Sequence, residues 1–274
     1  MKRLAVWLGA ASLSLAACSS GADFALVVAS SPEGIGSGPH RILVAVNDLT
    51  SGELVSDPSI EVTGILRNEN GSPIDEMAGE FLWALPETAG VYAFDFHFPE
   101  PATYQLTLET EPWGTLGPVG LVALDDPSVV GIGDDAPRSE TRTTATHDLA
   151  EITSDPDPDP SLYDSSIDEL IDAGPAVVLF SSYVDCRAEV CGTLLGQLKA
   201  LTPEFSGIGF AHVEVFETVT GPEAGAELVP AVSEWGLPSE PWLFVIDDLG
   251  EVQARFEGAA SDGDLRSAFG LVEP

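Results

Sequence analysis

A short apolar run, Ala176–Phe180, is the feature that most constrains the fold of this 274-residue chain. Its valine content and the serine pair that follows it indicate a buried β-strand. Two cysteines come next, Cys186 and Cys191, and residues 193–201 then have a helical pattern. A helix N-terminus favours the reactive thiolate, because the dipole and unpaired N–H groups stabilise negative charge. The stretch therefore predicts a strand, a cysteine pair and a helix in succession, which is a candidate redox site.

The four residues between the cysteines restrict the geometry of the pair. If both cysteines were helical, their Cα atoms would be roughly 8.5 Å apart. That separation exceeds the roughly 7 Å limit for a disulfide. Either Cys186 lies in the loop before the helix, or the first helical turn unwinds to form the bridge.

The first 17 residues predict a lipoprotein signal peptide. Lys2 and Arg3 precede an apolar run, which is typical of a secretory signal and is too short to span a membrane. Residues 15–18, Leu-Ala-Ala-Cys, resemble a bacterial lipobox. The resemblance implies cleavage before Cys18, lipid on that cysteine, a tether over residues 18–23 and an extracytoplasmic protein anchored to the bacterial cell membrane. The alternative is an ordinary signal peptide with an incidental cysteine.

The charge balance excludes some partners. Acidic residues outnumber basic ones by 45 to 10, and the net charge is −35. Loss of Lys2 and Arg3 with the signal peptide leaves 8 basic residues and a net charge of −37. Such a surface repels nucleic acid and anionic lipid headgroups. The negative surface charge favours solubility, or alternatively attracts a basic partner.

Residues 24–125 have the pattern of an antiparallel β-sandwich. About seven short strand-like segments alternate with turn signals over this stretch. Residues 89–92 and 101–106 resemble immunoglobulin-like accessory domains of bacterial surface proteins. This resemblance implies presentation or docking and no chemistry. An aromatic stripe on one face is expected to be core, and its members are Tyr92, Phe94, Phe96 and Phe98.

The remaining chain divides into a linker with a lead-in segment, residues 126–160, and a C-terminal domain, residues 161–274. The linker contains an alternating Asp-Pro run at residues 154–160. We expect a semi-rigid loop there and not a cation site, because the prolines stiffen the run without converging its carboxylates. Residues 133–137 are similar to the segment that leads into the fold of peroxiredoxins and membrane-anchored thioredoxin-like proteins.

The order of predicted elements from residue 130 onward, β-α-β-α-β-β-α, resembles the thioredoxin superfamily. Its second marker is the segment 236–245, which is similar to the thioredoxin segment in which a cis proline precedes a hairpin strand. Pro241 is the matching proline. The resemblance implies an α/β thioredoxin-like fold with Cys186, Cys191 and Pro241 at the active site, no cofactor and no metal.

The same resemblance implies a thiol–disulfide oxidoreductase. Cys186 would attack and Cys191 would resolve the mixed disulfide. The partners would be extracytoplasmic protein thiols or disulfides and an unknown redox donor. Arg187 favours the thiolate of Cys186, whereas Asp185 and Glu189 oppose it by like charge.

Three alternatives stay open. The cysteine spacing also resembles the bacterioferritin-comigratory branch of peroxiredoxins, although Tyr183 and Leu179 stand where that family needs Thr and Pro. Copper delivery of the Sco type would need His212, which falls only 21 residues after Cys191 inside a predicted strand. The last alternative is a non-enzymatic, lipid-anchored binding protein with a structural disulfide.

Overall fold

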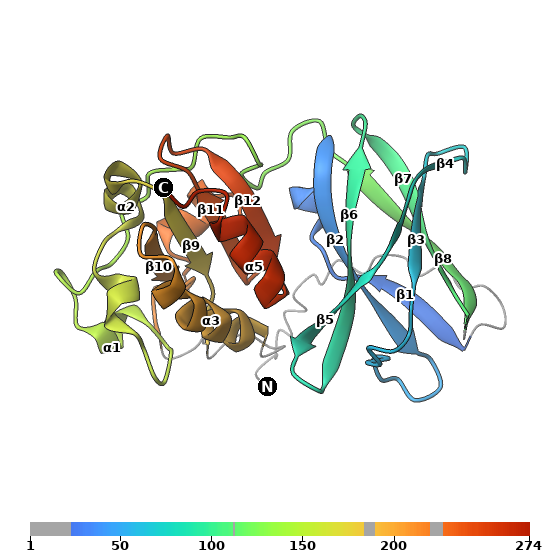
Figure 1. The fold of residues 1–274 in the computed structure, drawn as a ribbon, viewed down its shortest axis with the longest axis horizontal. Helices are drawn as coiled ribbons and strands as arrows, with labels where there is room; N and C mark the ends of the chain where they lie inside the picture. The colour runs from blue at the N-terminus through green and yellow to red at the C-terminus, as the bar shows by residue number, and fades with distance from the viewer. Residues whose placement is uncertain (1–22, 112, 184–189, 220–226) are drawn as a thin grey trace, which may run out of the picture.

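The computed structural model describes residues 23–111, 113–183, 190–219 and 227–274, and everything below concerns these residues. They form two units that pack side by side (Figure 1). The N-terminal unit is an antiparallel β-sandwich, and the C-terminal unit is a mixed sheet with helices on both faces.

Eight strands build the sandwich, in two four-stranded sheets with the orders β1-β2-β6-β5 and β4-β3-β7-β8. Every pairing within these sheets is antiparallel. A 3₁₀ turn, η1 (Pro32–Gly34), separates the first two strands. The strands are β1 (Phe24–Val28), β2 (Gly38–Asp48), β3 (Thr63–Arg67), β4 (Pro73–Ala78), β5 (Glu80–Leu85), β6 (Ala89–Phe98), β7 (Ala102–Thr110) and β8 (Gly114–Ala123).

The sandwich core contains the aromatic stripe of β6, as the two-residue period of a strand predicts. Each of its four rings is at most 1% exposed. Gly64 on β3 makes room for them, because a Cβ there would lie 2.5 Å from the Phe94 ring. The predictions of an antiparallel sandwich and of a structural aromatic stripe are confirmed.

The C-terminal unit is organised around a four-stranded sheet with the order β10-β9-β11-β12. β9 pairs with β10 in parallel and with β11 antiparallel. Its elements are α1 (Leu149–Ile152), η2 (Pro160–Tyr163), α2 (Ile167–Ala173), β9 (Ala176–Phe180), α3 (Val190–Leu201), η3 (Thr202–Glu204), β10 (Gly209–Val213), α4 (Pro230–Glu234), β11 (Trp242–Ile246), β12 (Val252–Glu257) and α5 (Asp262–Phe269).

Both faces of this sheet are covered, which explains why β9 is a continuous apolar run. Val177 and Leu179 belong to the core on one face, together with residues of α3 and α5. Val178 and Phe180 belong to the core on the other face, together with residues of α2 and α4. All five residues of β9 are fully buried, as the sequence predicted for this strand.

The two units share a small apolar contact. Leu43, Leu82 and Val91 on the outer face of the β1-β2-β6-β5 sheet pack against Ala259, which follows β12. Residues 126–160 run along the C-terminal unit, where Ala136 donates a backbone hydrogen bond to the Gly250 carbonyl. The sandwich therefore packs directly on the C-terminal unit in this structure.

The predicted α/β thioredoxin-like fold class was wrong. Three four-stranded sheets make the described chain predominantly β, and β9 with β10 is the one parallel pair among its strands. The longest described α-helix, α3, has 12 residues, while α1 and α4 have 4 and 5. Two of the three sheets belong to the sandwich, so the helices are a minor part of the described structure.

Candidate ligand-binding cavity

Of the residues predicted as a redox site, the structure describes Pro241 and Cys191. Pro241 follows a cis peptide bond and directly precedes β11. Cys191 lies at the start of α3, where it is 1% exposed and disulfide-bonded. Cys18 and Cys186 lie outside the described residues, as does Arg187.

The prediction of a thiol–disulfide oxidoreductase is corrected on this ground. The described part of the chain contains a single cysteine, and its sulfur is buried and already in a disulfide. This sulfur carries no thiol, and its burial shields the disulfide from attack by an external thiolate. The arrangement favours the alternative in which the bond is structural.

A cavity of about 370 Å³ opens beside the end of β10. One wall comes from residues 140–147 of the connecting segment, and another from the segment that leads into α4. The floor contains two polar residues of the β10 segment, His212 and Glu214, which are 3% and 4% exposed. The described lining is Glu140, Thr141, Arg142, Thr146, His147, Ile152, His212, Val213, Glu214, Phe216, Glu217, Val229, Pro230 and Ala231.

His212 belongs to a buried hydrogen-bond network. Its Nδ1 lies 2.7 Å from the Tyr163 hydroxyl, and its Nε2 lies 2.9 Å from the Ser181 hydroxyl. Tyr163 in turn donates to Thr153 Oγ1 at 2.9 Å. Burial lowers the pKa of His212 to about 4 and raises the pKa of Tyr163, so both are neutral near pH 7.

The contact between Ser181 and His212 is not a catalytic nucleophile and base. Ser181 is completely buried and is not part of the described cavity lining. A histidine whose pKa is about 4 is also a weak general base near neutral pH. The network fixes the floor of the cavity instead. It also occupies both ring nitrogens of His212, and the described residues contain no cluster of three metal-ligating side chains.

Glu214 is a buried carboxylate in the cavity lining. Its Oε2 accepts hydrogen bonds from the Ser154 backbone N–H at 2.8 Å and from the Ser154 hydroxyl at 2.6 Å. The Ser182 hydroxyl also interacts with this carboxylate and lowers its pKa, and no cation pairs with it among the described ion pairs. Burial raises the pKa of Glu214, since desolvation disfavours the carboxylate.

Two ion pairs lie near the Glu214 cavity. Arg142 donates to the carboxylate of Glu217 and, at 2.9 Å, to its carbonyl. Lys199 of α3 donates to Asp155 Oδ2 at 2.8 Å and to the Asp157 carbonyl. The Asp-Pro run thus binds a lysine of its own chain.

The buried histidine makes folding stability depend on pH. The folded-state pKa of His212 is about 4, below the ordinary 6.5. The stability that the neutral imidazole contributes is therefore complete above pH 6.5 and is lost as the pH falls toward 4. The loss amounts to about 3 kcal/mol over that window. The raised pKa of Glu214 acts in the opposite direction.

Urea denaturation at several pH values, compared between the wild type and His212→Gln, isolates this contribution. We expect the decline in stability between pH 6.5 and 4 to be shallower in the variant. His147→Gln, at an exposed histidine, serves as the control and retains the wild-type decline. Parallel curves for the wild type and His212→Gln would contradict the assignment.

His212 was among the residues considered from the sequence, whereas Glu214, Tyr163 and Ser182 were not predicted. A signal was available, because His212 and Glu214 are two positions apart in an otherwise apolar strand and so share one face. The partners of both residues come from segments 30 to 60 positions away, which no local pattern links to them.

The comparisons with known proteins do not place the chain in a family. No family model and no curated protein matches it. Among solved structures it is similar to the Lin-41 filamin domain, with 16% identity over 38% of this chain and 94% of that one and a TM-score of 0.26. It is also similar to the CARDB domain of the PF1109 protein from Pyrococcus furiosus, with 15% identity over 37% of this chain and 93% of that one and a TM-score of 0.24. A lipoprotein from Bacteroides thetaiotaomicron matches with 10% identity over 39% of this chain and 82% of that one and a TM-score of 0.20.

These TM-scores are too low to support a conclusion about fold or function. The expected membership of the thioredoxin superfamily is corrected, because no family model supports it and the described chain is predominantly β. None of the described helices is long and apolar enough to cross a membrane.

Proposed function

We propose that this chain is a non-enzymatic binding protein, lipid-anchored outside the cytoplasm, and that the cavity above His212 and Glu214 is its ligand site. The observation that carries the proposal is the buried carboxylate of Glu214 in the cavity lining, which has no cationic partner among the described ion pairs. Burial of a carboxylate without a counter-ion is unfavourable, because the lost hydration is not replaced. A ligand cation that donates to this carboxylate would offset that cost.

The ligand class follows from the charges that line the cavity. Arg142 is already paired with Glu217, whereas Glu140 and Glu214 have no cationic partner among the described ion pairs. The net charge of −35 adds attraction for a cation at longer range. The ligand is therefore a cation with N–H donors, an alkylammonium or alkylguanidinium group, whose stem contacts apolar lining residues such as Phe216 and Val229.

The lipid anchor rests on the lipobox-like residues 15–18 and remains part of the proposal. Cys18 would carry the lipid. In the chain, the sandwich then follows the anchor and precedes the unit that contains the cavity. In this arrangement the sandwich serves as a rigid support that holds the cavity away from the membrane.

Calorimetric titration of the full chain in detergent tests the ligand class. Propylguanidinium and propylammonium are the probes, and propionate and propanol are the matched controls. We expect the two cations to bind and the controls not to bind. Glu214→Gln removes the charge at constant size and is expected to weaken binding at least 10-fold, because hydrogen bonds to charged groups contribute about 1.5–3 kcal/mol.

Glu76→Gln is the control variant, since Glu76 is an exposed residue of β4 in the sandwich. It changes the net charge by the same amount and is expected to keep the wild-type affinity. Equal affinity for propionate, or equal weakening by Glu214→Gln and Glu76→Gln, would overturn the proposal.

A further inference from the structure

A second cavity, of about 310 Å³, lies at the junction of the two units. It is independent of the Glu214 cavity, since the two share no lining residue. The sandwich contributes residues 30–41 and Asp95, and the C-terminal unit contributes parts of β11, β12 and α5. Ligand sites occur preferentially at such interfaces.

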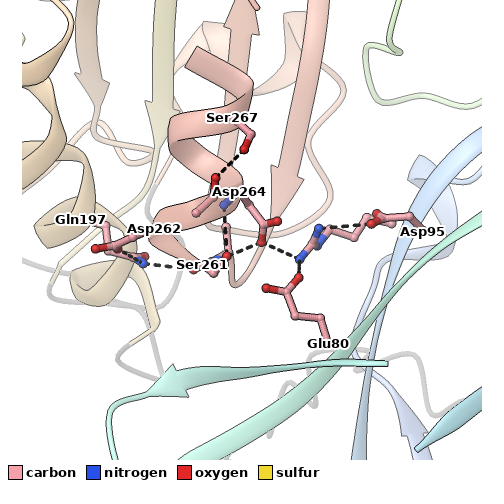
Figure 2. Close-up of polar contacts among 10 residues, drawn as sticks. Glu80, Asp95, Gln197, Ser261, Asp262, Asp264 and Ser267 are labelled. Carbon is pink, nitrogen blue, oxygen red and sulfur yellow. Dashed lines mark hydrogen bonds and ion pairs between the residues drawn. The ribbon is translucent and has the colours of Figure 1, made fainter. Parts of the chain in front are cut away.

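Arg41 of β2 is the central side chain of this cavity. Its guanidinium pairs with Glu80 at 2.8 Å, with Asp264 of α5 at 2.7 Å and with Asp95 at 3.4 Å, which links the sandwich to α5 (Figure 2). The same guanidinium lies 5.8 Å from the centre of the Phe256 ring. Its Nε–H is buried and has no acceptor among the described residues.

The other charged groups of the junction are already engaged. Arg255 donates to the Gly34 carbonyl and to the Val130 carbonyl at 2.8 Å. Glu257 accepts from the Ser31 backbone N–H at 2.9 Å and from the Ser239 hydroxyl at 2.8 Å. The polar contacts left for a ligand are the Arg41 donor and the carboxylates around it.

These contacts favour a neutral ligand. Arg41 faces three carboxylates, so an added anion would meet net negative charge, and an added cation would compete with Arg41 itself. A hydroxyl group can accept from Nε–H and donate to Asp95 or Asp264 at the same time. Apolar lining from Ile35, Pro39 and Phe256 suits carbon-bound hydrogens. We propose that the junction cavity binds a neutral polyhydroxylated ligand the size of a monosaccharide.

Titration of the full chain in detergent with D-glucose and D-galactose, followed by NMR chemical shifts, tests this assignment. Acetate and methylammonium serve as the charged controls. We expect saturable shifts from a sugar at residues 30–41 and in α5. Arg41→Lys keeps the cation but removes the Nε–H donor, and it is expected to weaken sugar binding about 2- to 10-fold, as for loss of one neutral hydrogen bond.

A second variant guards against a folding defect in Arg41→Lys. Ser267 lies on α5 (Figure 2), is exposed and lines the cavity. Ser267→Phe is therefore expected to block the cavity sterically and abolish sugar binding. Propylguanidinium binding at Glu214 should be unchanged in that variant, which separates failure here from failure of the proposed function. Preferential binding of acetate, no binding of either sugar, or sugar binding that survives Ser267→Phe would overturn the assignment.

Discussion

Replacement of Arg255 by alanine is expected to lower the free energy of unfolding by about 3–5 kcal/mol, since each buried carbonyl left without a donor costs about 1–3 kcal/mol. The guanidinium joins three parts of the chain. From β12 it donates to the carbonyl of Gly34, the last residue of η1, to the Val130 carbonyl at 2.8 Å, and to His40 Nδ1 at 3.0 Å. It also lies 5.7 Å from the centre of the Trp242 ring. The variant would leave buried carbonyl groups without a donor at the point where the sandwich meets the C-terminal unit.

Urea denaturation of the wild type and the variant measures this loss. Arg67→Ala is the matched control, because Arg67 donates within its own hairpin to the Gly71 carbonyl at 3.2 Å. It is expected to change stability by no more than about 0.5 kcal/mol. Similar changes for Arg255→Ala and Arg67→Ala would show that the junction contributes little to folding.

The second large effect is expected at Trp235, at the end of α4. This side chain is 0% exposed, and its ring centre lies 4.6 Å from that of Phe244 and 5.2 Å from that of Phe180. Its Nε1–H donates to the Ser139 hydroxyl at 3.1 Å. Trp235→Ala removes a buried indole and leaves a cavity between β9, β11 and α4, so we expect a loss of about 3–5 kcal/mol.

Trp83→Ala provides the comparison. Trp83 on β5 is only partly buried, with the Phe81 ring 5.0 Å away, and its loss is expected to be clearly smaller. The midpoint of urea denaturation checks both variants. An equal shift for the two would contradict the claim that Trp235 anchors α4 and the connecting segment to the C-terminal sheet.

The sandwich was predictable from the sequence because its strands are short, alternate in polarity and are separated by turn signals. The β6 stripe, for example, needs only the two-residue period to be placed in the core. β9 was equally predictable, since a short valine-rich run between Gly174-Pro175 and a serine pair is typical of a buried strand. Each of these features is local, and local patterns determine them.

The site was not predictable in the same way. The strand, cysteine and helix pattern around Cys191 suggested redox chemistry, but local order does not encode whether a thiol is exposed, and Cys191 is buried. The partners that define the Glu214 cavity and the Arg255 junction are joined only by tertiary packing. Arg255 and Gly34 are 221 positions apart, and no periodicity relates them.

The most direct test of the binding-protein account is an NMR titration of the full chain, in detergent, with propylguanidinium. The account predicts saturable shifts centred on Ser154, Ser182 and Glu214, and their loss in Glu214→Gln. Shifts scattered over the exposed carboxylates without saturation, or shifts that persist in Glu214→Gln, would contradict it.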